Sequence, residues 1–191
     1  LGGERRKATI LFCDIKDFTS LSEKLSPEEV VELLNEYFAE MVSVIIKYEG
    51  TLDKFIGDEI LAVFGTPIFH DDDAKRAVLA AVEMQQKLKI FNAKRRMSGR
   101  DEIGIGIGIH TGELVAGNIG TDVRMEYTVI GDTVNLASRI EALNRQFDTQ
   151  ILISESTYRE VSGAIVTREI PLVDVKGREK KIKVHEVLDV L

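Results

Sequence analysis

The stretch IGIGIGI at residues 103–109 alternates isoleucine and glycine without interruption. Successive side chains of a strand point to opposite faces, so we expect the isoleucines on one face and the glycines on the other. Glycine weakens a strand, and a face without side chains indicates that another group approaches the backbone closely. A ligand, a helix or a second protomer would each meet this requirement, and close helix packing is the simplest of the three.

Strand-like and helix-like segments alternate on both sides of this stretch. The apolar run ATILFC at residues 8–13 predicts a central strand that is buried on both faces. Ser26 followed by Pro27 and Glu29 predicts the start of a helix that ends near Gly50. We also expect a hairpin of strands at 51–56 and 60–64, a helix at 72–97, and strands at 114–119 after a turn at Gly112 and at 125–130. A helix capped by Asp132, a strand at 150–153 and a short helix at 154–161 follow, and the tail at 164–190 is expected to form strands on both sides of residues 175–178. This order predicts an α+β sandwich with a mixed central sheet.

Composition excludes several classes of protein. The 191 residues carry a formal charge of −7, which argues against a general nucleic-acid binder. One cysteine excludes a disulfide framework and a CxxC zinc site. No apolar run is long enough to span a membrane and no signal peptide is evident, so we expect no membrane contact and a cytoplasmic location. We expect one domain over residues 1–191, cut from a longer protein because the chain begins without Met.

Two carboxylates stand out by their positions. Asp14 follows the apolar strand at 8–13, and Asp58 lies at the tip of the predicted hairpin. If these strands are neighbours, both carboxylates meet at one edge of the sheet, where they would bind Mg²⁺ and leave positions for phosphate oxygens. The alternative is that both residues only form turns, since Asp is common there.

Other polar residues could belong to the same site, although each of them taken alone has an ordinary structural explanation. Phe18 and Thr19 open a predicted short helix, whose first amides are suited to phosphate, although Thr is also an ordinary cap. Asn135 and Arg139 share one face of the helix after Asp132, because they are four residues apart. Taken alone, that pair is better explained as a solvated face. Two lysines, at positions 54 and 176, would alone be ordinary exposed side chains.

Taken together, these segments resemble the catalytic domain of class III adenylyl and guanylyl cyclases over nearly the whole chain. The matching motifs are LFCDIKDFT at residues 11–19, KFIGD at 54–58, YTVIGDTVNLASR at 127–139 and, more weakly, VKG at 175–177. The resemblance implies a mostly antiparallel sheet flanked by helices, with a ferredoxin-like, palm-like core. It also implies conversion of ATP to cyclic AMP and pyrophosphate with two Mg²⁺ or Mn²⁺ ions.

The resemblance assigns a role to each motif residue. Asp14, Asp58 and the carbonyl of Ile15 look like metal ligands, and Phe18 and Thr19 fall in the loop that holds the β- and γ-phosphates. The remaining roles are purine recognition by Lys54 and Thr128, ribose orientation by Asn135, transition-state stabilisation by Arg139 and triphosphate contact by Lys176. The family builds its site between two protomers, so the metal carboxylates and the phosphate loop would come from one and the remaining residues from the other. A homodimer with shared sites is therefore implied, with sensor domains in the rest of the full-length chain.

The choice of base follows from hydrogen bonding. Adenine presents N1 as an acceptor and its 6-amino group as a donor, which complement a Lys54 donor and a Thr128 acceptor. Many family members carry Asp where Thr128 stands, and the Lys–Thr pair resembles the cyanobacterial and bicarbonate-responsive soluble adenylyl cyclases. Because a hydroxyl can also donate, a guanylyl cyclase is the nearest alternative. A nucleotide-binding module without catalysis and a protein-interaction domain are alternatives of other classes.

Overall fold

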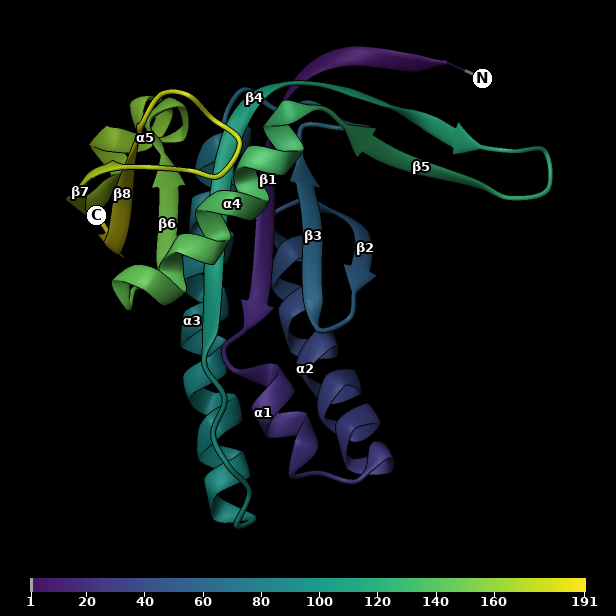
Figure 1. The fold of residues 1–191 in the computed structure, drawn as a ribbon, viewed down its shortest axis with the longest axis vertical. Coiled ribbons are helices and arrows are strands. Elements are labelled where there is room, and N and C mark those ends of the chain that lie inside the picture. Colours follow the sequence, from purple (N-terminus) through teal and green to yellow (C-terminus); the bar gives the residue numbers. More distant parts are fainter. Residues whose placement is uncertain (1) are drawn as a thin grey trace.

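Eight strands form one sheet in the computed structural model, which describes residues 2–191 (Figure 1). The strand order is β2-β3-β1-β4-β6-β8-β7, and β5 pairs with β4. The pairing of β4 with β6 is parallel and the others are antiparallel, which confirms the mixed, mostly antiparallel sheet. The strands are β1 (Gly3–Ile15), β2 (Thr51–Ile56), β3 (Glu59–Phe64), β4 (Ile105–Gly120), β5 (Met125–Ile130), β6 (Ile151–Ser154), β7 (Ile165–Val173) and β8 (Ile182–Val190).

Helices cover both faces of this sheet. In Figure 1, α2 and α3 lie behind the sheet and α4 crosses in front of it. The side chains of β1 alternate between the two faces, with Leu11 and Cys13 in the core under α2 and α3, and Ile10 and Phe12 in the core on the opposite face. The helices are α1 (Phe18–Glu23), α2 (Pro27–Lys47), α3 (Asp73–Met97), α4 (Asp132–Phe147), α5 (Glu155–Val161) and the 3-10 turn η1 (Ser162–Ala164).

The alternating stretch packs against helices on both faces. Its isoleucines lie in the core shared with α2 and α3. Its glycines face α4, and a methyl group added at Gly108 would lie 2.3 Å from the backbone nitrogen of Glu141. Helix packing therefore explains the bare face.

The start of α2 follows the predicted capping box. The backbone N–H of Glu29 donates to Ser26 Oγ (3.2 Å), and the backbone N–H of Ser26 donates to Glu29 Oε2 (2.8 Å). Pro27 is the first helical residue, where its missing N–H costs nothing. The helix therefore begins where local sequence chemistry places it.

Two local predictions were wrong. β4 runs through Gly112 without a turn, because this glycine makes room for Thr133, whose Oγ1 would lie 2.7 Å from an added methyl group. Asp132 does not cap α4 but is its first residue, and Gly131, at φ 142°, takes the cap position. The Asp132 carboxylate pairs with Arg178 instead. The strands expected on both sides of residues 175–178 are confirmed as β7 and β8, and the loop at 174–181 joins them through a turn in which the Arg178 N–H donates to the Val175 carbonyl (3.0 Å).

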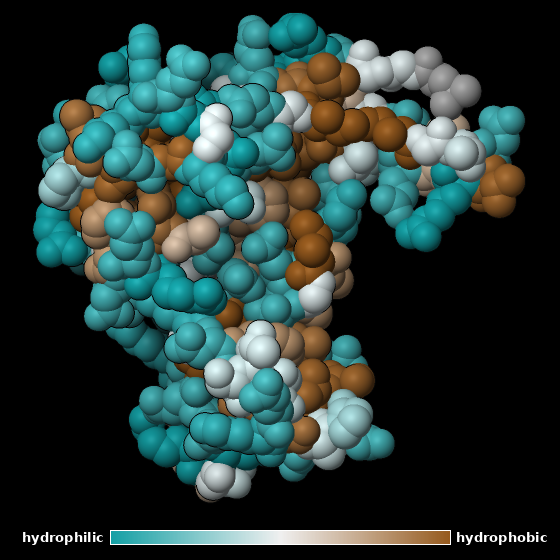
Figure 2. All heavy atoms as spheres, viewed as in Figure 1, coloured by the Kyte–Doolittle hydropathy of each residue, from teal (hydrophilic) through white to brown (hydrophobic). Residues whose placement is uncertain are grey.

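The ends of β4 and β5 extend from the body as an arm (Figure 1). Apolar residues are visible along this arm and on the body beneath it (Figure 2). Val123 at the tip of the arm is 96% exposed, and Ile56 at the end of β2 is 50% exposed. Among residues 2–191, no helix is both long and apolar enough to cross a membrane.

Candidate active site

The two carboxylates singled out by position lie at one edge of the sheet. Asp14 stands near the end of β1, and Asp58 lies in the turn between β2 and β3. β1 pairs directly with β3, with Cys13 opposite Ile60. As a result, the backbone N–H of Ile15 donates to Asp58 Oδ2 (3.2 Å), which ties the turn to the end of β1.

A hollow of about 170 Å³ opens beside these carboxylates. It is lined by Asp14, Ile15, Asp17, Phe18, Thr19, Ser20, Asp58 and Arg145. No side chain caps the first turn of α1, so its first amides remain available as donors on this side. The hollow thus combines carboxylate oxygens, helix amides without a side-chain cap and Arg145, which was not predicted from the sequence.

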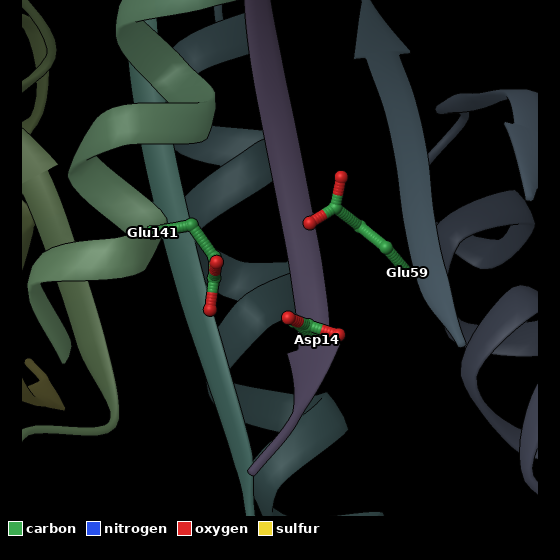
Figure 3. Close-up of side chains that lie close together, drawn as sticks. All are labelled: Asp14, Glu59 and Glu141. Atoms are coloured by element: carbon green, nitrogen blue, oxygen red, sulfur yellow. The ribbon is translucent and has the colours of Figure 1, made fainter. Parts of the chain in front are cut away.

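Two further carboxylates belong to the same cluster. Glu59 from β3 and Glu141 from α4 point toward Asp14 (Figure 3), and one oxygen of each of the three lies within 4.8 Å of the others. Sequence reasoning missed both residues. The only signal for Glu59 was its position beside Asp58 at the start of a buried strand, and for Glu141 its position between apolar helix residues.

Burial and mutual repulsion control the protonation of this cluster. Burial, followed by the neighbouring Asp58, raises the pKa of Asp14 to about 8. Burial, and to a smaller extent the charge of Glu59, raises the pKa of Glu141 to about 7. Burial, and to a smaller extent the charge of Asp58, also raises the pKa of Glu59. Carboxylate oxygens are the ligands of hard divalent cations, and a cation here would favour the charged forms. The donor set therefore fits a hard divalent cation.

Lys54 and Thr128, the predicted purine pair, lie together through a shared neighbour. The Thr128 hydroxyl donates to the carboxylate of Asp53, with Oγ1 at 2.9 and 3.0 Å from its two oxygens. Lys54 Nζ lies 3.7 Å from Asp53 Oδ1 and 3.7 Å from Glu126 Oε2. Sequence reasoning did not identify Asp53, because nothing local distinguishes it from other strand carboxylates.

The residues expected to contact phosphate and ribose from α4 lie near the loop at 174–181. Asn135 is exposed and Arg139 is half-buried, so neither belongs to the buried face of α4. A methyl group added at Gly177 would lie 3.2 Å from Arg139 Nη2, which places Arg139 against the turn that carries Lys176. Arg178 of the same turn pairs with Asp132 at the start of α4.

These residues form separate groups in a single chain. Within residues 2–191, no hydrogen bond or ion pair joins the purine pair, Arg139 or Lys176 to Asp14 or Asp58. The residues expected at the metals, at the purine and at the triphosphate thus form three groups without a direct polar contact between them in one chain.

His110, His185 and Cys13 pack against neighbouring residues of the fold. His110 Nδ1 lies 2.7 Å from Ser154 Oγ, and burial lowers its pKa to about 4. His185 stacks on Tyr158. Cys13 is fully buried, and burial raises the pKa of its thiol.

The family model described as the adenylate and guanylate cyclase catalytic domain matches residues 3–188. Adenylate cyclase 1 of Rhizobium meliloti (strain 1021) is 37% identical over 187 residues, covering 98% of this chain and 28% of that protein. The adenylate cyclase of Anabaena cylindrica is 43% identical over 190 residues, covering 95% of this chain and 37% of that protein. The chain therefore spans only about a third of the length of these relatives.

Solved structures include one cyclase of each base preference. The adenylyl cyclase CyaB of P. aeruginosa superimposes with a TM-score of 0.93 at 38% identity, covering 99% of this chain and 97% of that one. The guanylyl cyclase Cya2 has the same TM-score at 42% identity, covering 100% and 96%. Overall similarity therefore does not separate the two substrates, and the purine-contacting residues must decide between them.

Proposed function

Because the chain belongs to the adenylate and guanylate cyclase catalytic domain family, we propose that residues 1–191 are one adenylyl cyclase catalytic domain, which converts ATP to 3′,5′-cyclic AMP and pyrophosphate. The observation that carries the proposal is the meeting of Asp14 and Asp58 beside a hollow lined by the first residues of α1. That arrangement supplies metal ligands and phosphate donors side by side.

Divalent cations belong to this proposal, and their ligands are the carboxylates of Asp14 and Asp58 with the carbonyl of Ile15. Two Mg²⁺ or Mn²⁺ ions bound there would lower the pKa of the ribose 3′-hydroxyl and neutralise charge on the leaving phosphates. Glu59 and Glu141 adjoin Asp14, and they add negative charge that favours cation binding.

The chain's own residues bind and orient the triphosphate. In the reaction the 3′-oxygen attacks the α-phosphorus in line and pyrophosphate leaves. Amides at Phe18 and Thr19 hold the β- and γ-phosphates at the hollow. Arg139 donates to oxygens of the α-phosphoryl group as their charge grows, while Asn135 orients the ribose and Lys176 contacts the triphosphate.

The substrate sites are shared in a homodimer. This assignment is supported by the absence, within residues 2–191, of polar contacts between the residue groups of one chain. It is also supported by the exposed apolar side chains on the arm and on β2, which a second copy would cover. Under two-fold symmetry, the metal edge of one protomer faces the purine pair and Arg139 of its partner. Each dimer then contains two equivalent sites, and a monomer is inactive.

ATP is favoured over GTP by the Lys54–Thr128 pair, in which a lysine donor meets adenine N1 and a threonine acceptor meets the 6-amino group. The observation that favours a guanylyl cyclase instead is the likeness to Cya2, at 42% identity. Assays with both nucleotides separate these functions directly.

The proposal is tested by measuring cyclic nucleotide formation from ATP and from GTP, with Mg²⁺ or Mn²⁺, across a dilution series. We expect cyclic AMP, and a specific activity that falls on dilution. Preference for GTP would overturn the base assignment, and nucleotide binding without product would indicate a regulatory module. A chain that binds no nucleotide would be better explained as an interaction domain.

Mixing two inactive variants tests the shared site. Asp58→Ala and Arg139→Ala should each abolish turnover, but an equal mixture should recover about a quarter of wild-type activity, because half of the dimers are mixed and each keeps one intact site. A mixture that stays inactive while both variants dimerise would contradict the shared site.

A further inference from the structure

The Thr128 hydroxyl leaves base selection undetermined unless something fixes its direction. A hydroxyl both donates and accepts, so a free Thr128 could accept from the 6-amino group of adenine or donate to O6 of guanine. Thr128 can therefore select adenine only if its hydroxyl proton is donated to an acceptor other than the base.

Asp53 is placed to accept this proton. It lies at the irregularity of β2 between Leu52 and Lys54, where the register against β3 shifts. Its side chain is only 3% exposed, and both carboxylate oxygens lie within 3.0 Å of Thr128 Oγ1. A carboxylate can only accept, so the hydroxyl proton of Thr128 points to Asp53.

We infer that Asp53 is a positioning residue that determines base specificity, by holding the Thr128 hydroxyl proton and leaving only oxygen lone pairs for the base. The inference rests on the proposed function and deepens it. With its proton held, Thr128 accepts a hydrogen bond from the adenine 6-amino group. With guanine, the lone pairs of the Thr128 oxygen would face those of O6, and the two acceptors would repel each other. The site thereby selects against guanine with a residue that never touches the nucleotide.

Direct contact of Asp53 with the base is a rival explanation with the opposite consequence. A carboxylate facing the base would accept from guanine N1–H and favour GTP. The Asp53 carboxylate instead faces Thr128 and is buried, while the more exposed Glu126 also lies 3.7 Å from Lys54. The two explanations therefore predict opposite shifts when the charge of Asp53 is removed.

Asp53→Asn separates them with little change of shape. One oxygen becomes an N–H₂ donor within hydrogen-bond distance of Thr128 Oγ1, which frees the hydroxyl proton for the base. We expect the ATP-to-GTP ratio of kcat/KM to fall about tenfold or more, because guanine O6 gains a donor. Glu126→Gln is the matched control, since it removes a carboxylate at the same distance from Lys54 without touching Thr128, and its ratio should change by less than about twofold.

Thr128→Val tests whether Asp53 acts through the hydroxyl. This variant should lose ATP preference by itself, and adding Asp53→Asn to it should change the ratio by less than about twofold. An unchanged or higher ATP preference in Asp53→Asn, an equal shift in Glu126→Gln, or a persisting Asp53 effect in the Thr128→Val background would each overturn the inference. Should Asp53→Asn fail to fold, an unchanged ratio in Thr128→Val would overturn it as well.

The wild-type protein separates this inference from the proposed function. If it forms no cyclic nucleotide, the proposed function is overturned, and the same ratios are then read from ATP and GTP binding affinities. If it forms cyclic AMP and the Asp53→Asn ratio does not move, only the inference is overturned.

Discussion

Replacing Gly108 with alanine should force α4 away from the sheet. The added methyl group would lie 2.3 Å from the nitrogen and 2.5 Å from the Cα of Glu141, and both are backbone atoms that no rotamer change can move. Ordinary contact between such atoms is about 3.5–4 Å, so the helix has to retreat by more than about 1 Å.

The magnitude follows from two opposing effects. Overpacking of this kind costs about 1–3 kcal/mol, and a clash with backbone belongs at the upper end of that range. Alanine is favoured over glycine in a strand by roughly 0.5–1 kcal/mol. The net loss should be about 2 kcal/mol, which lowers Tm by roughly 4–8 °C for a chain of this size. Because α4 carries Asn135 and Arg139, kcat should fall by about a hundredfold.

Gly104, the residue just before β4, provides the matched control. A methyl group added there would lie 3.4 Å from Cδ of Lys16, a flexible side chain that can move aside. Gly104→Ala should therefore keep its Tm within about 2 °C of wild type. Thermal unfolding by circular dichroism and cyclic AMP assays measure both effects. Equal Tm values for the two variants, or full turnover in Gly108→Ala, would refute the packing explanation.

Other parts of the structure support further predictions. Because the native pKa of Asp14 is raised from 3.8 to about 8, the folded metal-free protein holds more protons than the unfolded chain, and its stability should fall as pH rises between those values. Asp14→Asn should flatten this dependence in melts with EDTA and should be inactive; a wild-type Tm that rises over this range would contradict the sign. Ser26→Ala removes half of the capping box with Glu29 and should cost about 1 kcal/mol, measured by the urea midpoint, with turnover unchanged. Arg178→Ala frees the Lys176 turn from α4 and should raise the ATP KM about tenfold while changing stability by less than about 1 kcal/mol; an unchanged KM would show that the pair does not position the turn.

Interactions between near neighbours in the chain were predictable from sequence. The capping box of α2 joins residues three apart, and the hairpin around Gly57 and Asp58 needs only a two-residue turn. The burial of β1 on both faces follows from its continuous apolar run. Local predictions failed where a distant partner changed the outcome, as when Thr133 filled the space beside Gly112 and Arg178 engaged Asp132.

By itself, the sequence determined the class of fold and the family, because periodicity, caps and motif order depend on residues close together in the chain. Only the tertiary structure decided how the candidate site residues are tuned. Glu59 and Glu141 reach Asp14 from different elements, and Asp53 meets Thr128 from 75 positions away. The protonation of a carboxylate and the direction of a hydroxyl proton depend on what lies within a few ångströms, and folding alone brings those neighbours together.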